Sequence, residues 1–545
     1  MRHEGLGFPH PLAFWSGCLL IMIGVVAHVP MFLHSAAMNY KMAGMEMDAT
    51  MWVGMGVIPL GVLLAWFGLM PRLELLRQGS HGTINFHVAD NSPLNVEHWK
   101  LVAALLVAVT VDVMKPATLG FVMPGMKDEY GISQSSSGTL ALIALTGTAV
   151  GSILWGRLAD LMGRRAAILL SALMFIGTAI CGAMPSFTWN LIMCFLMGLS
   201  AGGLLPITFT LMAEVIPAAH RGWLLVALGG IGTAAGYLVA SGAAAVLEPL
   251  FSWRALWFLG LPTGLIIIFL GRYIPESPRF LANVGLKRQA QAVLNRYNGV
   301  LDRDEPEHVE VEEAASEGDK GLKQMLTGPY APISLGLVGA GLAWGLVNFG
   351  FLLWLPTNLR DMGMSPEAAN GLLAKSGFLA LPGIVAVMWL YHAWSSIKTL
   401  VTFIALTALS LLVFFVLGLL SIQSSLAITF ATAGLLISAS GVIAMLIPYA
   451  AEIYPVHLRG TGAGLVAASS KAGGILGAVC GVIGVFSDLA FSALIISVPL
   501  LIFGGLLLKN GIDTRGRRLE EIHAAVTFKA ASRFSAVTPQ ESEAT

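Results

Sequence analysis

The sequence has few charged residues, few cysteines and no net charge, and each of these shortages excludes a class of protein. Only 11% of the 545 residues are charged and 56% are apolar, whereas soluble domains carry about 25% charged residues. A soluble globular enzyme and an intrinsically disordered chain are therefore both excluded. The 31 basic residues are balanced by 31 acidic residues, so no nucleic-acid partner is expected.

Motifs for catalysis and nucleotide binding are also missing. The sequence contains no nucleophile elbow, no paired carboxylate site and no glycine-rich loop that continues into Gly-Lys-Ser/Thr. Ordinary catalysis and ATP-driven pumping are therefore not expected, and no cofactor is needed beyond a proton gradient. The four cysteines lie far apart in apolar runs, where free thiols behave as small hydrophobic side chains.

The sequence is instead rich in long apolar runs. A membrane-spanning helix needs about 20 apolar residues, and fourteen such runs are present, so the chain is predicted to be an all-α membrane protein. They are 12–33, 52–70, 100–123, 137–158, 166–185, 188–212, 223–246, 254–274, 331–355, 371–391, 399–420, 425–449, 461–483 and 487–508.

Arginine and lysine gather in alternate connections between these runs, which predicts that both chain termini are cytoplasmic. A short surface helix is expected over 284–299, before an acidic stretch at 302–319. The predicted parts are a two-span extension (1–71), a cytoplasmic linker (72–99), a six-span repeat (100–274), a cytoplasmic central loop (275–330), a second six-span repeat (331–508) and a cytoplasmic tail (509–545).

The two six-span segments share a motif at a fixed spacing. The stretch 213–222 is matched by 451–460, so that a glutamate, a proline, an arginine and a glycine each recur 238 positions later. Parallel repeats of six spans, with a substrate site between them near the middle of the membrane, are a plan of secondary transporters. The chain is therefore predicted to be an internal duplication preceded by two additional spans.

Three further motifs resemble those of the major facilitator superfamily. The stretch 156–165 (GRLADLMGRR) resembles its signature loop, 275–281 (PESPRFL) resembles the sugar-porter and metabolite–proton-symporter branches, and 350–359 (GFLLWLPTNL) resembles aromatic-acid symporters. The resemblance implies a major facilitator fold with alternating access. It also implies a conformational latch formed by Gly156, Asp160, Gly163, Arg164, Arg165, Glu214, Arg221, Glu452 and Arg459. The alternative is that these residues only hold the loop together as a structural staple.

Charged residues inside spans are costly and by default functional. Asp112 and Lys115 lie three residues apart on one helical face, and Lys471 lies in the middle of its run. One interpretation makes Asp112 the proton-coupling carboxylate and places Lys115 and Lys471 in a cavity for an anionic substrate, with Asn348 and Trp354 as further contacts. In the other, Asp112 and Lys115 only neutralise each other.

The loop after the first span is rich in methionine and histidine. Seven of the 24 methionines fall within residues 28–55, and thioether with imidazole suits soft cations such as Cu(I) or Ag(I). The alternative is that methionine is flexible packing material or an oxidant scavenger. The candidate ligands are His28, Met31, His34, Met38, Met42, Met45, Met47 and Met51.

These patterns favour a proton-coupled secondary transporter of a small organic metabolite, most simply an organic anion. Two alternatives stay open, namely a copper or other soft-metal transporter that uses the methionine-rich loop and a non-transporting receptor on a transporter scaffold. The expected partners are a small-molecule substrate, protons and the lipid bilayer. A monomer in a bacterial inner membrane is favoured.

Overall fold

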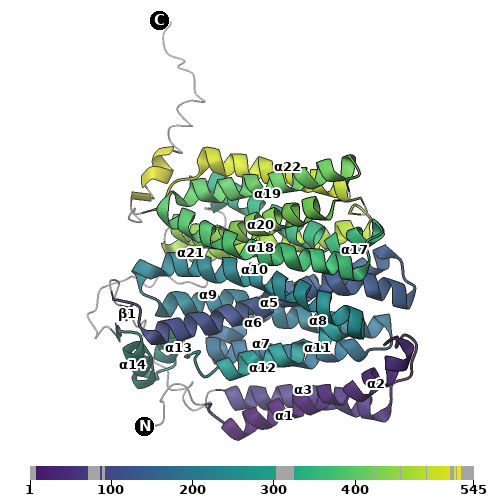
Figure 1. Cartoon of the computed structure of the whole chain (residues 1–545). Coiled ribbons are helices and arrows are strands. Elements are labelled where there is room, and N and C mark those ends of the chain that lie inside the picture. The colour runs from purple at the N-terminus through teal and green to yellow at the C-terminus, as the bar shows by residue number, and fades with distance from the viewer. Residues whose placement is uncertain are drawn as a thin grey trace, which may run out of the picture. The chain divides into compact units, whose positions relative to one another are not determined.

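The computed structural model describes residues 8–70, 86–88, 92–301, 325–422, 424–454, 456–486, 488–515, 521–522 and 524–529. Almost all of these residues are helical (Figure 1). The predicted acidic stretch at 302–319 and most of the linker lie outside the described residues. Cys18, Cys181, Cys194 and Cys480 are free thiols, as predicted.

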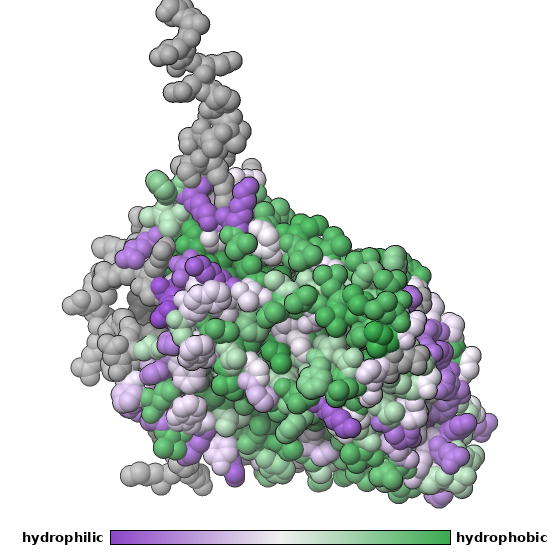
Figure 2. All heavy atoms as spheres, turned by 45° about the horizontal axis from the view of Figure 1, so that its top comes forward, coloured by the Kyte–Doolittle hydropathy of each residue, from purple (hydrophilic) through white to green (hydrophobic). Residues whose placement is uncertain are grey.

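Large apolar side chains are exposed on many of the helices, for example Trp15 at 47%, Phe67 at 57% and Trp389 at 66%. Figure 2 shows a broad apolar surface on the face that it presents. An apolar surface of this extent is incompatible with water but suits a lipid bilayer, which also requires every backbone polar group to be bonded internally, as helices achieve.

Thirteen of the described helical segments are long and apolar enough to cross a membrane. They agree with thirteen of the fourteen predicted spans. The exception is the run predicted at 254–274, which folds as two shorter helices, α11 (Ala255–Phe258) and α12 (Gly260–Leu270). The expected continuous span is therefore interrupted at Leu259.

The N-terminal extension is a helical hairpin. It consists of α1 (Pro11–Val26), α2 (Val29–His34), η1 (Ser35–Met38) and α3 (Ala49–Leu69). Glycines let α1 and α3 approach closely, since a Cβ atom at Gly17 would lie 2.6 Å from the Gly61 carbonyl oxygen and one at Gly24 would lie 2.7 Å from that of Gly54. Both helices also contact α7.

The first repeat follows the hairpin and belongs to the same compact unit. Its helix α5 packs against α10, α6 against α8, and α7 against α12. The elements are α5 (Val96–Tyr130), α6 (Gln134–Met162), α7 (Arg164–Thr178), η2 (Ala179–Ala183), α8 (Phe187–Ala201), α9 (Leu204–Val215), α10 (Ala218–Phe251), α11 and α12.

The central loop contains more structure than a single surface helix. Helices α13 (Pro278–Asn283) and α14 (Lys287–Arg296) precede a strand, β2 (Gly299–Leu301). This strand pairs antiparallel with β1 (Phe86–Val88) from the linker. The predicted all-α fold is confirmed apart from this small two-stranded sheet, which was not predicted because two three-residue strands leave no detectable periodicity in a sequence.

The second compact unit contains most of the second repeat. Residues Leu352–Phe378 and Ala478–Ser487, which belong to that repeat in the sequence, pack in the first unit instead. The elements of the second repeat are α16 (Ala331–Leu346), the π-helical turn η3 (Val347–Leu352), α17 (Leu355–Asp361), α18 (Pro366–Ala393), α19 (Ser396–Leu419), α20 (Ser425–Ile453), α21 (Val456–Val482) and α22 (Leu489–Asn510).

Candidate functional site

The signature loop of the first repeat is built around a buried carboxylate, Glu276. Its Oε1 accepts hydrogen bonds from the backbone N–H groups of Arg165, at 3.2 Å, and Ser277, at 2.9 Å. Burial raises the pKa of Glu276, and these two hydrogen bonds act in the opposite direction. Gly163 turns the chain into α7 with φ +100, and a Cβ atom there would lie 2.4 Å from the Glu276 carboxyl group. The loop therefore requires glycine for two independent reasons.

A chain of charged groups extends from this loop to α9. Arg164 lies 3.3 Å from Asp160 and 3.7 Å from Glu214, joining α6 to α9. Glu214 also accepts a hydrogen bond from Ser277 Oγ. Asp160 is 74% exposed, whereas the side chains of Arg164 and Glu214 are largely buried. The inner part of the cluster therefore holds three helix ends together, and Asp160 is its exposed end.

The second repeat contains a corresponding cluster, of which the sequence analysis predicted only Glu452. Glu452 Oε2 accepts hydrogen bonds from Thr514 Oγ1, at 2.6 Å, and from Tyr391, at 3.1 Å. Asp513 Oδ1 accepts from the Ser396 backbone N–H at 3.1 Å. Burial acts to raise the pKa of Asp513, but the hydrogen bonds from Ser396 outweigh it and leave the pKa lowered.

The two clusters share one arrangement. In the first repeat Glu276, after the sixth span, caps the first turn of the third span, and Ser277 donates a hydrogen bond to the glutamate of the fourth span. In the second repeat Asp513 and Thr514 do the same. The two pairs, Glu-Ser and Asp-Thr, share no residue identity and match only in the chemistry of their side chains. A sequence search for an acidic residue followed by a hydroxyl-bearing residue after each sixth span would have found both pairs.

The remaining predicted latch residues are placed differently. Arg221 donates to the Ile216 carbonyl at 3.3 Å. Arg459 lies in α21, but its side chain is outside the described part of the structure. Gly156 is exposed, and a Cβ atom there would meet nothing within 4 Å. Packing therefore gives no reason for a glycine at position 156.

The two glycines of the signature loop provide a matched pair of variants. We expect Gly163→Ala to reduce the amount of folded protein and the uptake rate severalfold, because the new methyl group meets Glu276 and the backbone is strained. Gly156→Ala should leave both unchanged, since the site is open and helical. Uptake normalised to the folded fraction tests this, and equal losses in both variants would contradict it.

Asp112 and Lys115 form a buried ion pair within α5. The Lys115 Nζ atom lies 3.3 Å from Asp112 Oδ1 and 4.3 Å from the centre of the Phe175 ring on α7. The Lys115 side chain has no exposed surface, and that of Asp112 is 7% exposed. The structure thus brings both predicted residues together and adds Phe175, an aromatic face that stabilises a cation.

The other predicted substrate contacts are dispersed. Lys471 is half-buried in α21, and Asn348 is half-buried in η3. Trp354 is 1% exposed and packs against two glycines, where Cβ atoms at Gly138 and Gly481 would lie 2.8 and 2.4 Å from its ring. Its surroundings favour a packing role, whereas π-helical turns such as η3 occur frequently at functional sites.

The methionine and histidine residues of the loop differ in their exposure. His28, Met31, Met42 and Met51 are buried, Met45 and Met47 are half-buried, and His34 and Met38 are exposed. His34 Nδ1 lies 2.9 Å from the Pro30 carbonyl oxygen. Among the described residues, no three His, Cys, Asp or Glu side chains come together as a metal site.

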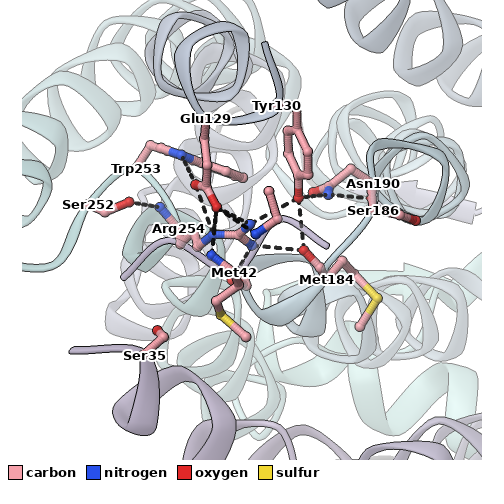
Figure 3. A network of polar contacts seen from close by, with 12 residues as sticks. Ser35, Met42, Glu129, Tyr130, Met184, Ser186, Asn190, Ser252, Trp253 and Arg254 are labelled. Atoms are coloured by element: carbon pink, nitrogen blue, oxygen red, sulfur yellow. Dashed lines mark hydrogen bonds and ion pairs between the residues drawn. The ribbon is translucent and has the colours of Figure 1, made fainter. Parts of the chain in front are cut away.

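The loop is attached to the first repeat by a polar network that the sequence did not reveal (Figure 3). Glu129 at the end of α5 pairs with Arg254 at 2.7 Å, and the two side chains are 5% and 0% exposed. Glu129 Oε1 also accepts hydrogen bonds from the backbone N–H groups of Met42, at 2.7 Å, and Ala43, at 3.1 Å. The Glu129 carboxylate therefore binds the backbone N–H groups of the methionine-rich loop.

The rest of the network accepts the remaining hydrogen bonds of the Arg254 guanidinium group. Arg254 donates to the carbonyl oxygens of Gly182 and Met184 and to the Tyr130 hydroxyl, at 2.8 to 3.2 Å. Trp253 Nε1 donates to Glu129 Oε2 at 2.9 Å. A buried ion pair is stable only when its remaining donors and acceptors are bonded in this way.

A second buried pair joins α10 to residues that belong to the second repeat in sequence. Arg360 lies 2.6 Å from Glu248, and Asn370 donates to the same carboxylate at 2.6 Å. The more exposed pair Lys127–Asp361, at 3.3 Å, lies nearby in sequence. These contacts are part of what holds 352–378 in the first compact unit.

Comparison with known proteins identifies the family. The sequence model described as Major Facilitator Superfamily matches residues 103–511. The chain belongs to the major facilitator superfamily. The match omits the N-terminal hairpin, so the two additional helices are an extension of the family's core. The chain is therefore an integral membrane transporter and not an enzyme.

Individual members of the superfamily resemble this chain over most of their length. It is 28% identical to the niacin transporter NiaP of Acinetobacter baylyi over 444 residues, covering 79% of this chain and 98% of that protein. It is 29% identical to the 4-hydroxybenzoate transporter PcaK of Pseudomonas aeruginosa over 399 residues, covering 71% and 86%. A partially occluded, inward-open structure of the xylose transporter XylE from E. coli matches with TM-score 0.61 at 16% identity, covering 78% of this chain and 100% of that one. At this identity the last match shows the fold alone.

Proposed function

We propose that this transporter carries small aromatic carboxylates across a bacterial inner membrane together with protons. Two similar proteins are named as transporters of niacin and of 4-hydroxybenzoate. Each of these compounds is an aromatic ring that bears one carboxylate. An anion of this kind needs a cation in the membrane interior, because an unpaired charge there is costly.

The buried pair Asp112–Lys115 is the observation that carries the proposal. At 3.3 Å the two charges neutralise each other. When a proton binds Asp112, Lys115 is left with an uncompensated positive charge, and a substrate carboxylate can replace the lost partner. When the substrate leaves, Lys115 again favours ionised Asp112 and the proton is released. One proton would thus accompany one anion.

An aromatic side chain beside Lys115 fits the same substrate class. The Phe175 ring already lies against the Lys115 ammonium group, and the substrate contact expected from Lys471 in α21 stays a prediction. A carboxylate with an aromatic ring would gain both ionic and stacking contacts. A neutral sugar has no carboxylate that could replace Asp112 beside Lys115, so sugars are expected to be poor substrates.

Uptake by proteoliposomes tests both the substrate class and the coupling. Nicotinate and 4-hydroxybenzoate should accumulate when the outside is acidic, and the neutral amide nicotinamide and xylose should not. Because one proton balances one anion, a membrane potential imposed with potassium and valinomycin should have no effect. Accumulation of nicotinamide to the same level as nicotinate would contradict the anion proposal, and accumulation driven by potential alone would contradict the stoichiometry.

A further inference from the structure

One buried side-chain nitrogen in the N-terminal hairpin makes no hydrogen bond among the described residues. His28 has no exposed surface, and its Nδ1 lies 2.8 Å from the Gly24 carbonyl oxygen. Because a carbonyl only accepts hydrogen bonds, Nδ1 carries the proton, and Nε2 keeps a free lone pair. Nε2 has no hydrogen-bond partner among the described residues, although a buried unbonded polar atom is costly.

The register of the hairpin brings His28 level with the first turn of α3. Gly17 lies against Gly61 and Gly24 against Gly54, so the two helices run antiparallel and His28 lies opposite the start of α3 (Ala49–Leu69). The His28 Cε1 atom lies 3.0 Å from the Cβ position of Gly54. Asp48 caps the N-terminus of α3, the end of the helix that lies level with His28.

Met51 lies in the first turn of α3, one turn before Gly54. Residues 48, 51 and 54 are spaced by three along the helix, and the Met51 backbone N–H bonds Asp48 Oδ1 at 2.8 Å. Met51 is fully buried. Met31 follows His28 after one turn and is 7% exposed. A free imidazole nitrogen is therefore accompanied by two buried methionines, Met31 one turn after His28 and Met51 one turn before Gly54, which His28 contacts.

We propose that His28 Nε2 and the sulfur atoms of Met31 and Met51 bind one soft monovalent cation, Cu(I) or Ag(I). A backbone carbonyl that fixes the Nδ1–H tautomer and directs Nε2 outward is the usual support of a metal-binding histidine. Thioethers select soft d10 cations over Zn²⁺ or Mg²⁺. The carboxylate of Asp48 contributes compensating negative charge. Met38, which is 49% exposed, and half-buried Met45 provide an entry path from the loop.

This site lies outside both six-helix repeats and depends on no part of the transport proposal. The hairpin is joined to the first repeat through Glu129 and the backbone of Met42 and Ala43. An ion bound at its closed end would hold α2 and the first turn of α3 together, and would stabilise the segment that Glu129 binds. The site is thus accessory to transport and is expected to respond to soft metals alone.

The test uses the full-length protein in detergent with Ag(I), which needs no reductant. After equilibration and desalting, the wild type should retain one silver ion per chain, and X-ray absorption should show one nitrogen and two sulfur neighbours. Met31→Leu/Met51→Leu is nearly volume-conserving and should lower the affinity at least tenfold. The matched control, Met38→Leu/Met45→Leu, should bind as the wild type does.

Two results would overturn the proposal. One is wild-type affinity for Ag(I) in the Met31→Leu/Met51→Leu variant, and the other is loss of the ion in the control variant only. His28→Gln is a weaker test, because the variant can fail to fold. Uptake of nicotinate by the metal-free Met31→Leu/Met51→Leu variant should equal that of the wild type, so failure of the metal proposal is distinguishable from failure of the transport proposal.

Discussion

Asp112→Asn is expected to abolish accumulation driven by a pH gradient while leaving substrate exchange intact. A symporter that moves one proton with one anion can concentrate its substrate about tenfold per pH unit, because 1.4 kcal/mol corresponds to a factor of ten. Asparagine cannot bind the coupling proton, so the accumulation ratio should fall to one. Lys115 remains to bind the carboxylate, so counterflow of labelled nicotinate should continue. Accumulation ratios in proteoliposomes across a one-unit gradient measure the effect.

Two controls separate coupling from folding. Asp128→Asn changes an exposed carboxylate near the end of the same helix and should accumulate substrate normally. Asp112→Asn/Lys115→Gln removes both charges, so no unpaired buried cation is left, and it should fold as well as the wild type while losing substrate affinity. Unchanged accumulation in Asp112→Asn would show that another group carries the proton, and normal substrate affinity in the double variant would show that Lys115 does not bind the substrate.

Breaking the Glu129–Arg254 pair should produce the largest loss of stability. Glu129→Gln leaves a fully buried guanidinium group without its counter-charge, and removal of one partner from a buried pair typically costs about 3–5 kcal/mol. The substitution also weakens the acceptor for the Met42 and Ala43 N–H groups. We expect a clearly lower midpoint of thermal unfolding in detergent and faster hydrogen exchange at residues 39–48.

The pair Lys127–Asp361 provides the matched control for this prediction. Its charges lie 3.3 Å apart, but the two side chains are 30% and 45% exposed. Exposed ion pairs contribute about 0–1 kcal/mol because water and salt screen them. Asp361→Asn should therefore unfold close to the wild-type temperature. If it is destabilised as strongly as Glu129→Gln, burial of the pair is not the cause.

The agreement between sequence and structure is best where a physical constraint is local. A span needs a run of apolar residues, and thirteen of the fourteen predicted runs are long membrane helices. The signature loop needs glycine at position 163 because the chain turns there with positive φ. The ion pair of Asp112 with Lys115 follows from their spacing of three on one helix. Each of these features depends on residues that are near one another in the chain.

Side-chain pairs whose members are far apart in the sequence could not be predicted from it. Glu129 and Arg254 are separated by 125 positions, and neither stands out from the other charges of its connection. Asp513 matches Glu276 only in its chemistry and in its place after a sixth span. Trp354 was grouped with the substrate contacts from its position in a run, whereas packing against Gly138 and Gly481 buries it.

The sequence by itself determined the membrane class, the duplication and the family, because hydropathy and short motifs are properties of neighbouring residues. Only the tertiary structure decided which charges are paired, which methionines are buried and how the hairpin is attached to the first repeat. Charge pairing, burial and attachment of the hairpin depend on side chains from different helices that contact one another. The burial of these side chains determines how costly an unpaired charge or an unbonded nitrogen is. The unbonded Nε2 of His28 belongs to this second group, since no pattern in the chain shows that its other nitrogen is already bonded.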